Sequence, residues 1–184
     1  EIREGLAEVI KYGVIKDDDL FLFLETNMES IFSYDKGALT RIIKRGCEIK
    51  GEVVEKDERE SNLRKILNFG HTIGHAVENL SGYKITHGEA ISIGMAAEGK
   101  IAVGMGLWKE EELGRLTRLL TRAGLPTSMP EYMNIQDIID TMKLDKKSRG
   151  GKIEMVLPET IGRMAEIGGS YGLKTDESLI RDAV

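Results

Sequence analysis

The three histidines of this chain, His71, His75 and His87, all lie in one short segment of the sequence. His71 and His75 are four residues apart, so on a helix they would share one face. Imidazole is the commonest nitrogen ligand of zinc, and clustered histidines are typical of metal sites. Histidines that meet by chance while capping helices would give the same spacing. The pattern therefore leaves two interpretations open, a metal centre and a set of capped helix ends.

A glycine stands beside each histidine: Gly70 and Gly74 flank His71 and His75, and Gly88 follows His87. Glycine inside a helix costs about 0.5–1 kcal/mol relative to alanine. We therefore expect something bulky to come close to the backbone here. A bound ligand and a tightly packed second helix both fit this expectation.

A catalytic zinc normally takes about three protein ligands and leaves one position for substrate. Two histidines and one carboxylate would complete such a set. Spacing alone does not choose among the carboxylates, of which the candidates are Glu8, Glu60, Glu78 and Glu89.

Several cationic residues lie within or beside apolar segments. Lysine and arginine are the residues that a phosphorylated or carboxylated substrate requires. For each one taken alone, a solvated helix face is the simpler interpretation. These residues are Lys11, Lys50, Arg64, Lys65, and the pair Lys146 and Lys147 that follows Asp145.

The elements that must position these residues are mostly helices. Helical spacing of apolar residues, acidic starts and glycine stops predict helices over residues 6–12, from about 20 to 25, 36–56, 63–80, 88–103, 110–123, 135–143 and 176–183. Residues 152–157 and 162–167 alternate by twos and predict a β-hairpin with its turn at 158–161. The expected fold is mainly α, a multihelical array with a small β-hairpin near the C-terminus, in a single domain over residues 1–184.

The composition excludes several classes of protein. A net charge of -5 argues against a general nucleic-acid binder. Since the sequence has no run of about 20 apolar residues, we expect no membrane span, and no signal peptide is visible. The lone cysteine, Cys47, fits a reducing, cytoplasmic setting, and its place in an apolar periodic run predicts a small core residue. The chain does not begin with Met, which is typical of a fragment.

Several motifs, in order, resemble the C-terminal domain of the 3-dehydroquinate synthase family. Together they cover essentially the whole chain, which makes the resemblance far more specific than any one motif. They are residues 5–13 (GLAEVIKYG), 47–50, 53–55, 57–60, 63–64, 67–78 (LNFGHTIGHAVE), 87–90, 94–95, 123–126 and 145–147.

The resemblance implies roles for individual residues. By motif, Glu8, His71 and His87 correspond to the family's ligands for zinc, for which cobalt is the alternative. His75 is implied to lie on the substrate or phosphate side of the site, and Glu60 to support it. The implied substrate-binding residues are Lys11, Lys50, Arg64, Asn68, His75, and Lys146 or Lys147; the implied catalytic residues are His75, Lys11, Lys50 and Glu60.

The family's reaction converts 3-deoxy-D-arabino-heptulosonate 7-phosphate, a sugar phosphate, to 3-dehydroquinate and phosphate in the shikimate pathway, with NAD and zinc as cofactors. The family's N-terminal domain binds NAD, and this sequence has no glycine-rich turn after a strand that could do so. Gly168 and Gly169 lie in a predicted loop near the end. We therefore expect the chain to need an N-terminal NAD-binding partner domain, to show no turnover alone, and, by analogy, to form a homodimer.

Three other functions remain as alternatives. A related sugar-phosphate cyclase, such as 2-deoxy-scyllo-inosose synthase, would share most of the motifs and differ near Lys50 and Asn68. A metal-dependent polyol dehydrogenase would not need so many anion-binding lysines. A catalytically silent helical interaction domain would not need Glu8, His71 and His87.

Overall fold

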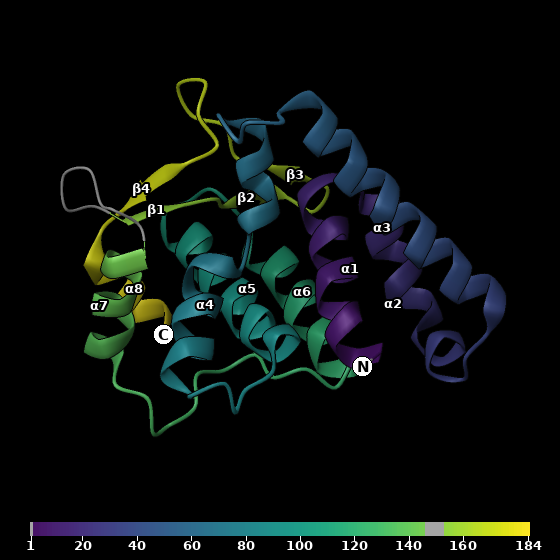
Figure 1. The fold of residues 1–184 in the computed structure, drawn as a ribbon, viewed down its shortest axis with the longest axis horizontal. Coiled ribbons are helices and arrows are strands. Elements are labelled where there is room, and N and C mark those ends of the chain that lie inside the picture. The colour runs from purple at the N-terminus through teal and green to yellow at the C-terminus, as the bar shows by residue number, and fades with distance from the viewer. Residues whose placement is uncertain (1, 146–152) are drawn as a thin grey trace.

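A computed structural model describes residues 2–145 and 153–184 of the chain. Helices dominate it, and the predicted mainly α architecture is confirmed (Figure 1). The helices are α1 (Ile2–Lys16), α2 (Asp18–Phe32), α3 (Lys36–Lys56), the 3-10 helix η1 (Leu63–Asn68), α4 (His71–Leu80), α5 (His87–Gly104), α6 (Glu110–Arg122), α7 (Ile135–Asp145) and α8 (Glu177–Ala183).

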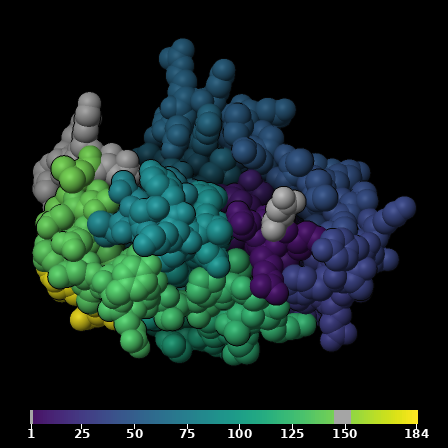
Figure 2. Space-filling view, turned by 60° about the horizontal axis from the view of Figure 1, so that its bottom comes forward, coloured from purple at the N-terminus to yellow at the C-terminus, as the bar shows by residue number. Residues whose placement is uncertain are grey.

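Helix α5 lies at the centre of the array and is buried on nearly every side. Its sequence explains this position, because a helix that is apolar all round, rich in Ala, Gly and Met, belongs in a core. Helices α1, α4, α6 and α8 pack around it, and α7 packs on the other side of α4. In Figure 2 the teal surface, which includes α4, lies between the purple surface of α1 and the green surface of the segment that ends in α7.

Glycines allow the central helices to approach one another closely. A Cβ added to Gly94 of α5 would overlap the carbonyl of Gly70, and one added to Gly74 would lie 2.9 Å from Ala90 O. At Gly88 it would lie 2.5 Å from Glu4 Cα in α1. Of the two explanations for glycines beside the histidines, tight helix packing is thus the one that the structure bears out.

The strands are short and antiparallel. β2 (Pro158–Thr160) pairs with β3 (Arg163–Met164), so a small hairpin lies near the C-terminus as predicted, but its first strand is the segment that was predicted as the turn. The segment β1 (Ile153–Met155) pairs instead with β4 (Leu173–Thr175). Gly162, with φ +91°, makes the hairpin turn much tighter than the predicted one at 158–161.

Two helix boundaries also differ from the prediction. The predicted helix over residues 63–80 is broken at Gly70, whose φ of +80° is incompatible with a continuous right-handed helix. Helix α1 continues through Gly13 to Lys16. Gly13 does not end the helix; it lets α2 approach, since an added Cβ would lie 3.0 Å from Phe21 Cβ.

Cys47 is exposed, so its predicted place in the core was wrong. The buried face of α3 follows Ala38, Ile42, Gly46 and Ile49, and Gly46 lies against the Tyr12 ring. One residue further along a helix is a rotation of about 100°, which takes Cys47 off that face. Among the described residues, no helix is long and apolar enough to cross a membrane.

Candidate metal centre

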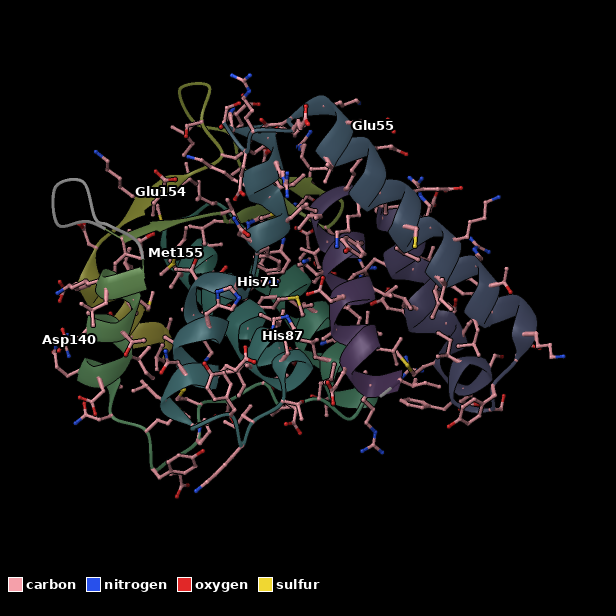
Figure 3. All side chains as sticks on the ribbon, in the orientation of Figure 1. Glu55, His71, His87, Asp140, Glu154 and Met155 are labelled. Carbon is pink, nitrogen blue, oxygen red and sulfur yellow. The ribbon has the colours of Figure 1, made fainter. Side chains whose placement is uncertain are left out.

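Three side chains converge from the helices α1, α4 and α5. Glu8 comes from the middle of α1, and His71 and His87 are the first residues of α4 and α5. His71 Nε2 lies 3.4 Å and His87 Nε2 3.9 Å from Glu8 Oε1. One ligand atom from each residue lies within 4.8 Å of the others, and Figure 3 shows His71 and His87 close together. One ion could therefore contact all three residues.

The local sequence fixes the start of each histidine-bearing helix. Helix α5 begins with a capping box, in which Thr86 and Glu89 bond each other's backbone N–H groups. This cap holds His87 at the first helical position. Helix α4 follows the left-handed Gly70, which turns the chain sharply so that His71 emerges beside Glu8.

The Nδ1 atom of each histidine faces an oxygen atom. His71 Nδ1 lies 3.1 Å from Phe69 O, and His87 Nδ1 lies 3.1 Å from Glu78 Oε2. A carbonyl or an ionised carboxylate only accepts, so each Nδ1 carries the proton and donates it. Each Nε2 then keeps its lone pair, and these two nitrogens lie 3.4 and 3.9 Å from Glu8 Oε1. Metal-binding histidines are commonly held in this way.

Glu8 offers one oxygen to the space between the histidines. Its Oε2 accepts a hydrogen bond from Lys11 Nζ at 2.8 Å. Its Oε1 is buried and accepts no hydrogen bond from the residues that the structure describes. A buried carboxylate oxygen without a donor is costly. The arrangement of this oxygen and two imidazole nitrogens fits a zinc or cobalt ion, which would give the oxygen a partner.

Electrostatics favour the unprotonated forms of Glu8 and His71 near neutral pH. Burial acts to raise the pKa of Glu8, but the ion pair with Lys11, with smaller contributions from His71 and His87, leaves the pKa lowered. Burial, with Lys11 nearby, lowers the pKa of His71 from its ordinary 6.5 to about 4. The pKa of Lys11 is itself lowered, first by burial and partly by Lys50.

The lowered pKa of His71 predicts that the metal-free chain loses stability in mild acid. Between pH 6.5 and about 4 the unfolded chain binds a proton at His71 that the folded chain does not. The free energy of unfolding should therefore fall as pH falls, by about 2 kcal/mol from pH 6.5 to 5. Urea unfolding in EDTA at each pH measures this slope. A His71→Gln variant should lose this part of it; the same slope in both proteins would contradict the prediction.

The structure places the predicted substrate residues on several different elements. His75 lies one turn after His71, is exposed, and has its ring centroid 5.2 Å from that of His71. Lys50, on α3, lies close enough to Lys11 to affect its pKa. Asn68 donates to Glu60 Oε1 at 2.8 Å. The predicted contacts Lys146 and Lys147 lie outside the described residues.

Beside His75, a cleft of about 530 Å³ opens between α4 and α7. Its walls carry both polar and apolar groups, so it could hold a small polar molecule in contact with His75, whose ring neighbours that of His71. It is lined by Thr72, His75, Ala76, Glu78, Asn79, Tyr83, Thr141, Met142 and Leu144.

The other three candidate carboxylates have different partners. Glu60 bonds Asn68, and Glu89 closes the capping box of α5. Glu78 faces the Nδ1 of His87, the nitrogen on the far side from Glu8. Of the four candidates, Glu8 is the one whose oxygen faces both Nε2 atoms.

Sequence reasoning missed Asp57, which organises the loop that carries Glu60 and Arg64. Its carboxylate accepts hydrogen bonds from the backbone N–H groups of Ser61, Asn62 and Arg64 at 2.8–3.0 Å. These bonds hold the pKa of Asp57 well below its usual range. An aspartate directly after a helix and before Ser and Asn is typical of a capped turn, and that signal could have identified it.

Glu78, a candidate ligand by sequence, lies where it would orient the ring of His87. Replacing it by Ala removes the acceptor for His87 Nδ1–H, so the ring loses its fixed orientation. We expect metal affinity to fall about tenfold, which is typical when such a partner is lost. Competition titration with a chromogenic chelator measures this change. The control is Glu89→Gln at the adjacent capping box, and equal affinities in wild type and Glu78→Ala would refute the assignment.

Comparison with known families now adds to this geometry. The family model described as 3-dehydroquinate synthase C-terminal matches residues 5–148. The chain belongs to this family. The match begins just before Glu8 and includes all three residues that could hold a metal ion.

Curated relatives agree with the family match. The chain is 51% identical over 167 residues to the 3-dehydroquinate synthase of Synechococcus sp. (strain ATCC 27144 / PCC 6301 / SAUG 1402/1), covering 89% of this chain and 45% of that protein. It is 53% identical over 165 residues to that of Thermodesulfovibrio yellowstonii, covering 89% of this chain and 46% of that protein. The chain thus spans about half the length of the curated relatives it matches.

Two solved structures with a similar fold are synthases that contain NAD+ and a metal ion. A 2-epi-5-epi-valiolone synthase from Streptomyces hygroscopicus subsp. jinggangensis 5008, with NAD+ and Zn2+ bound, matches 99% of this chain and 49% of its own, with a TM-score of 0.86 and 28% identity. A 2-deoxy-scyllo-inosose synthase complexed with carbaglucose-6-phosphate, NAD+ and Co2+ matches 99% of this chain and 50% of its own, with a TM-score of 0.81 and 25% identity.

Proposed function

We propose that this chain is the metal- and substrate-binding half of a 3-dehydroquinate synthase. The observation that carries the proposal is the convergence of Glu8, His71 and His87 beside the buried Lys11. The complete enzyme would convert 3-deoxy-D-arabino-heptulosonate 7-phosphate to 3-dehydroquinate and phosphate, as a phosphate-eliminating lyase of the shikimate pathway. The identity of about 50% to curated 3-dehydroquinate synthases supports this choice of substrate.

In this proposal Glu8, His71 and His87 hold zinc, or cobalt in its place. The metal would act as a Lewis acid that lowers the pKa of a bound substrate hydroxyl. His75 and the cleft beside it would receive the phosphate side of the substrate. The chain's own residues thus account for metal binding and for much of the substrate's orientation, which is a large part of any such rate enhancement.

The cations would neutralise the anionic substrate. Lys11 pairs with Glu8, and Lys50 lies close enough to Lys11 to lower its pKa. The backbone N–H of Arg64 donates to Asp57, and its guanidinium donates to Glu58 O. Glu60 would support Asn68 by accepting from its amide, which fixes the direction of the side-chain carbonyl. One of Lys146 and Lys147 is proposed as a further phosphate contact.

The described part of this chain lacks the usual dinucleotide-binding unit. Its paired strands are all antiparallel, so the described ranges contain no strand–turn–helix unit of the dinucleotide-binding type. We therefore propose that an N-terminal NAD-binding domain supplies the cofactor. Both structural neighbours named above contain NAD+, and each is about twice as long as the part that this chain covers.

Among the alternatives, a related cyclase is the nearest. The identities of 25% and 28% to the inosose and valiolone synthases are about half of those to 3-dehydroquinate synthases, which favours the first proposal. A polyol dehydrogenase would release no phosphate, and a silent interaction domain would bind no metal. A homodimer in the cytoplasm completes the proposal, and sedimentation of the full enzyme would test the dimer.

The decisive experiment joins the chain to the N-terminal half of the Thermodesulfovibrio yellowstonii relative. Phosphate release is then measured with zinc, NAD and 3-deoxy-D-arabino-heptulosonate 7-phosphate, with glucose 6-phosphate as the competing substrate. We expect release from the heptulosonate alone, loss of release in a Lys50→Met variant, and none from the isolated chain. Release from glucose 6-phosphate instead would replace the proposal with the inosose synthase alternative.

A further inference from the structure

Helix α4 begins without a side-chain cap of its own. Its N-cap residue is Gly70, which has no side chain to accept from the first backbone N–H groups. Those N–H groups have no partner within the helix and need one from elsewhere. Water cannot readily provide a hydrogen-bond partner here, because Gly70 is buried. The residue that follows it is His71.

A carboxylate from α5 supplies the missing cap. Glu98 is fully buried, and its Oε2 accepts from Gly70 N–H at 2.7 Å. Its Oε1 accepts from Ile73 N–H at 3.2 Å. These are the N-cap and N3 donors, the two that a capping box would satisfy from within the helix. A negative charge at this end of a helix also interacts favourably with the helix dipole.

The same face of α5 also contacts the Gly70 carbonyl. Gly94 lies one turn before Glu98, and its backbone is so close to Gly70 O that an added Cβ would overlap that atom. Helix α5 therefore meets both the N–H and the C=O of the residue that precedes His71. These two contacts at Gly70 restrict both the axial position of α4 and its rotation relative to α5.

That placement matters because the two histidines come from these two helices. His71 opens α4 and His87 opens α5, and their ring centroids are 5.5 Å apart. A rotation or an axial shift of α4 would change the separation of their Nε2 atoms. Helix α4 also carries His75, so the same shift would move the cleft wall.

We propose that Glu98 is a positioning residue for the metal centre. Its two carboxylate oxygens accept from the backbone N–H groups of Gly70 and Ile73, so it acts on the metal centre through the backbone at the start of α4. The inference rests on the proposed function, since it concerns the placement of a ligand for that metal. A cap that only stabilised the fold would lower the melting temperature without changing metal affinity.

The test compares Glu98→Ala with a matched variant, Glu112→Ala, in the chain as it stands. Glu112 is also a helix carboxylate that accepts from a backbone N–H, that of Ile161 at 2.9 Å, but it lies at the start of α6. Both variants should melt at lower temperature. We expect about tenfold weaker Zn2+ and Co2+ binding in Glu98→Ala alone, with a changed Co2+ visible spectrum. Glu98→Gln, which keeps one acceptor oxygen, should lie between Ala and wild type.

Hydrogen exchange provides a second readout. Amides of residues 70–76 should exchange faster in Glu98→Ala, and those of α6 should not. Wild-type metal affinity and spectrum in Glu98→Ala would overturn the inference and leave the metal centre intact. Absence of metal binding in the wild-type chain would overturn the metal assignment and this inference together.

Discussion

The double variant His71→Ala, His87→Ala is expected to bind no measurable zinc under conditions in which the wild-type chain holds about one ion. Structural zinc sites contribute roughly 10–16 kcal/mol from four ligands, so each ligand accounts for about 3–4 kcal/mol. Each single variant should therefore bind zinc on the order of 10²–10³-fold more weakly. The structural reason is that both Nε2 atoms face Glu8 Oε1, at 3.4 and 3.9 Å. Elemental analysis after zinc loading and dialysis measures the bound metal.

His75→Ala is the control for this experiment. It removes an imidazole from the same helix, one turn further on, and its ring lies as close to His71 as the ring of His87 does. His75 is exposed and is not part of the cluster that can share an ion. Its variant should keep wild-type zinc content and lose phosphate release in the joined enzyme. Equal loss of zinc in the single variants His71→Ala, His87→Ala and His75→Ala would mean that the ligand assignment is wrong.

Part of this site could be predicted from the sequence by local geometry. His71 and His75 lie four residues apart, and the glycines beside them indicated a crowded backbone. Local reasoning could not choose Glu8, because its place depends on how α1 packs against α5 through Gly88. The resemblance to a known family named Glu8, and the geometry of its oxygen is independent support for that proposal.

The errors have a common cause, which is that tertiary packing decided between local alternatives. Alternation by twos identified β-segments near the C-terminus, but pairing depends on what lies opposite, and β1 found β4. Apolar periodicity identified α3, but a shift of one residue separates buried Gly46 from exposed Cys47. The role of Glu98 could not be predicted from the sequence for the same reason. A glutamate within an apolar helix acquires its role only when the start of another helix lies against it.

Gly94→Ala should be among the most destabilising single substitutions in the chain. The added methyl group would overlap the Gly70 carbonyl, and that atom is backbone, so it cannot rotate away as a side chain could. Helices α4 and α5 must separate to admit it. Overpacking of this kind costs about 3 kcal/mol or more, which corresponds to a fall of about 10 °C in melting temperature for a chain of this size.

The matched control is Gly51→Ala in α3, where an added Cβ meets nothing within 4 Å. Alanine is the better helix former, so this variant should gain about 0.5–1 kcal/mol. Thermal melts of the three proteins give the stability comparison, and zinc titrations give a second. Because separation of α4 from α5 also separates His71 from His87, Gly94→Ala should bind zinc more weakly even at temperatures where it stays folded. A Gly94→Ala protein with wild-type stability and zinc affinity would mean that the contact between these helices does not set the geometry of the metal centre.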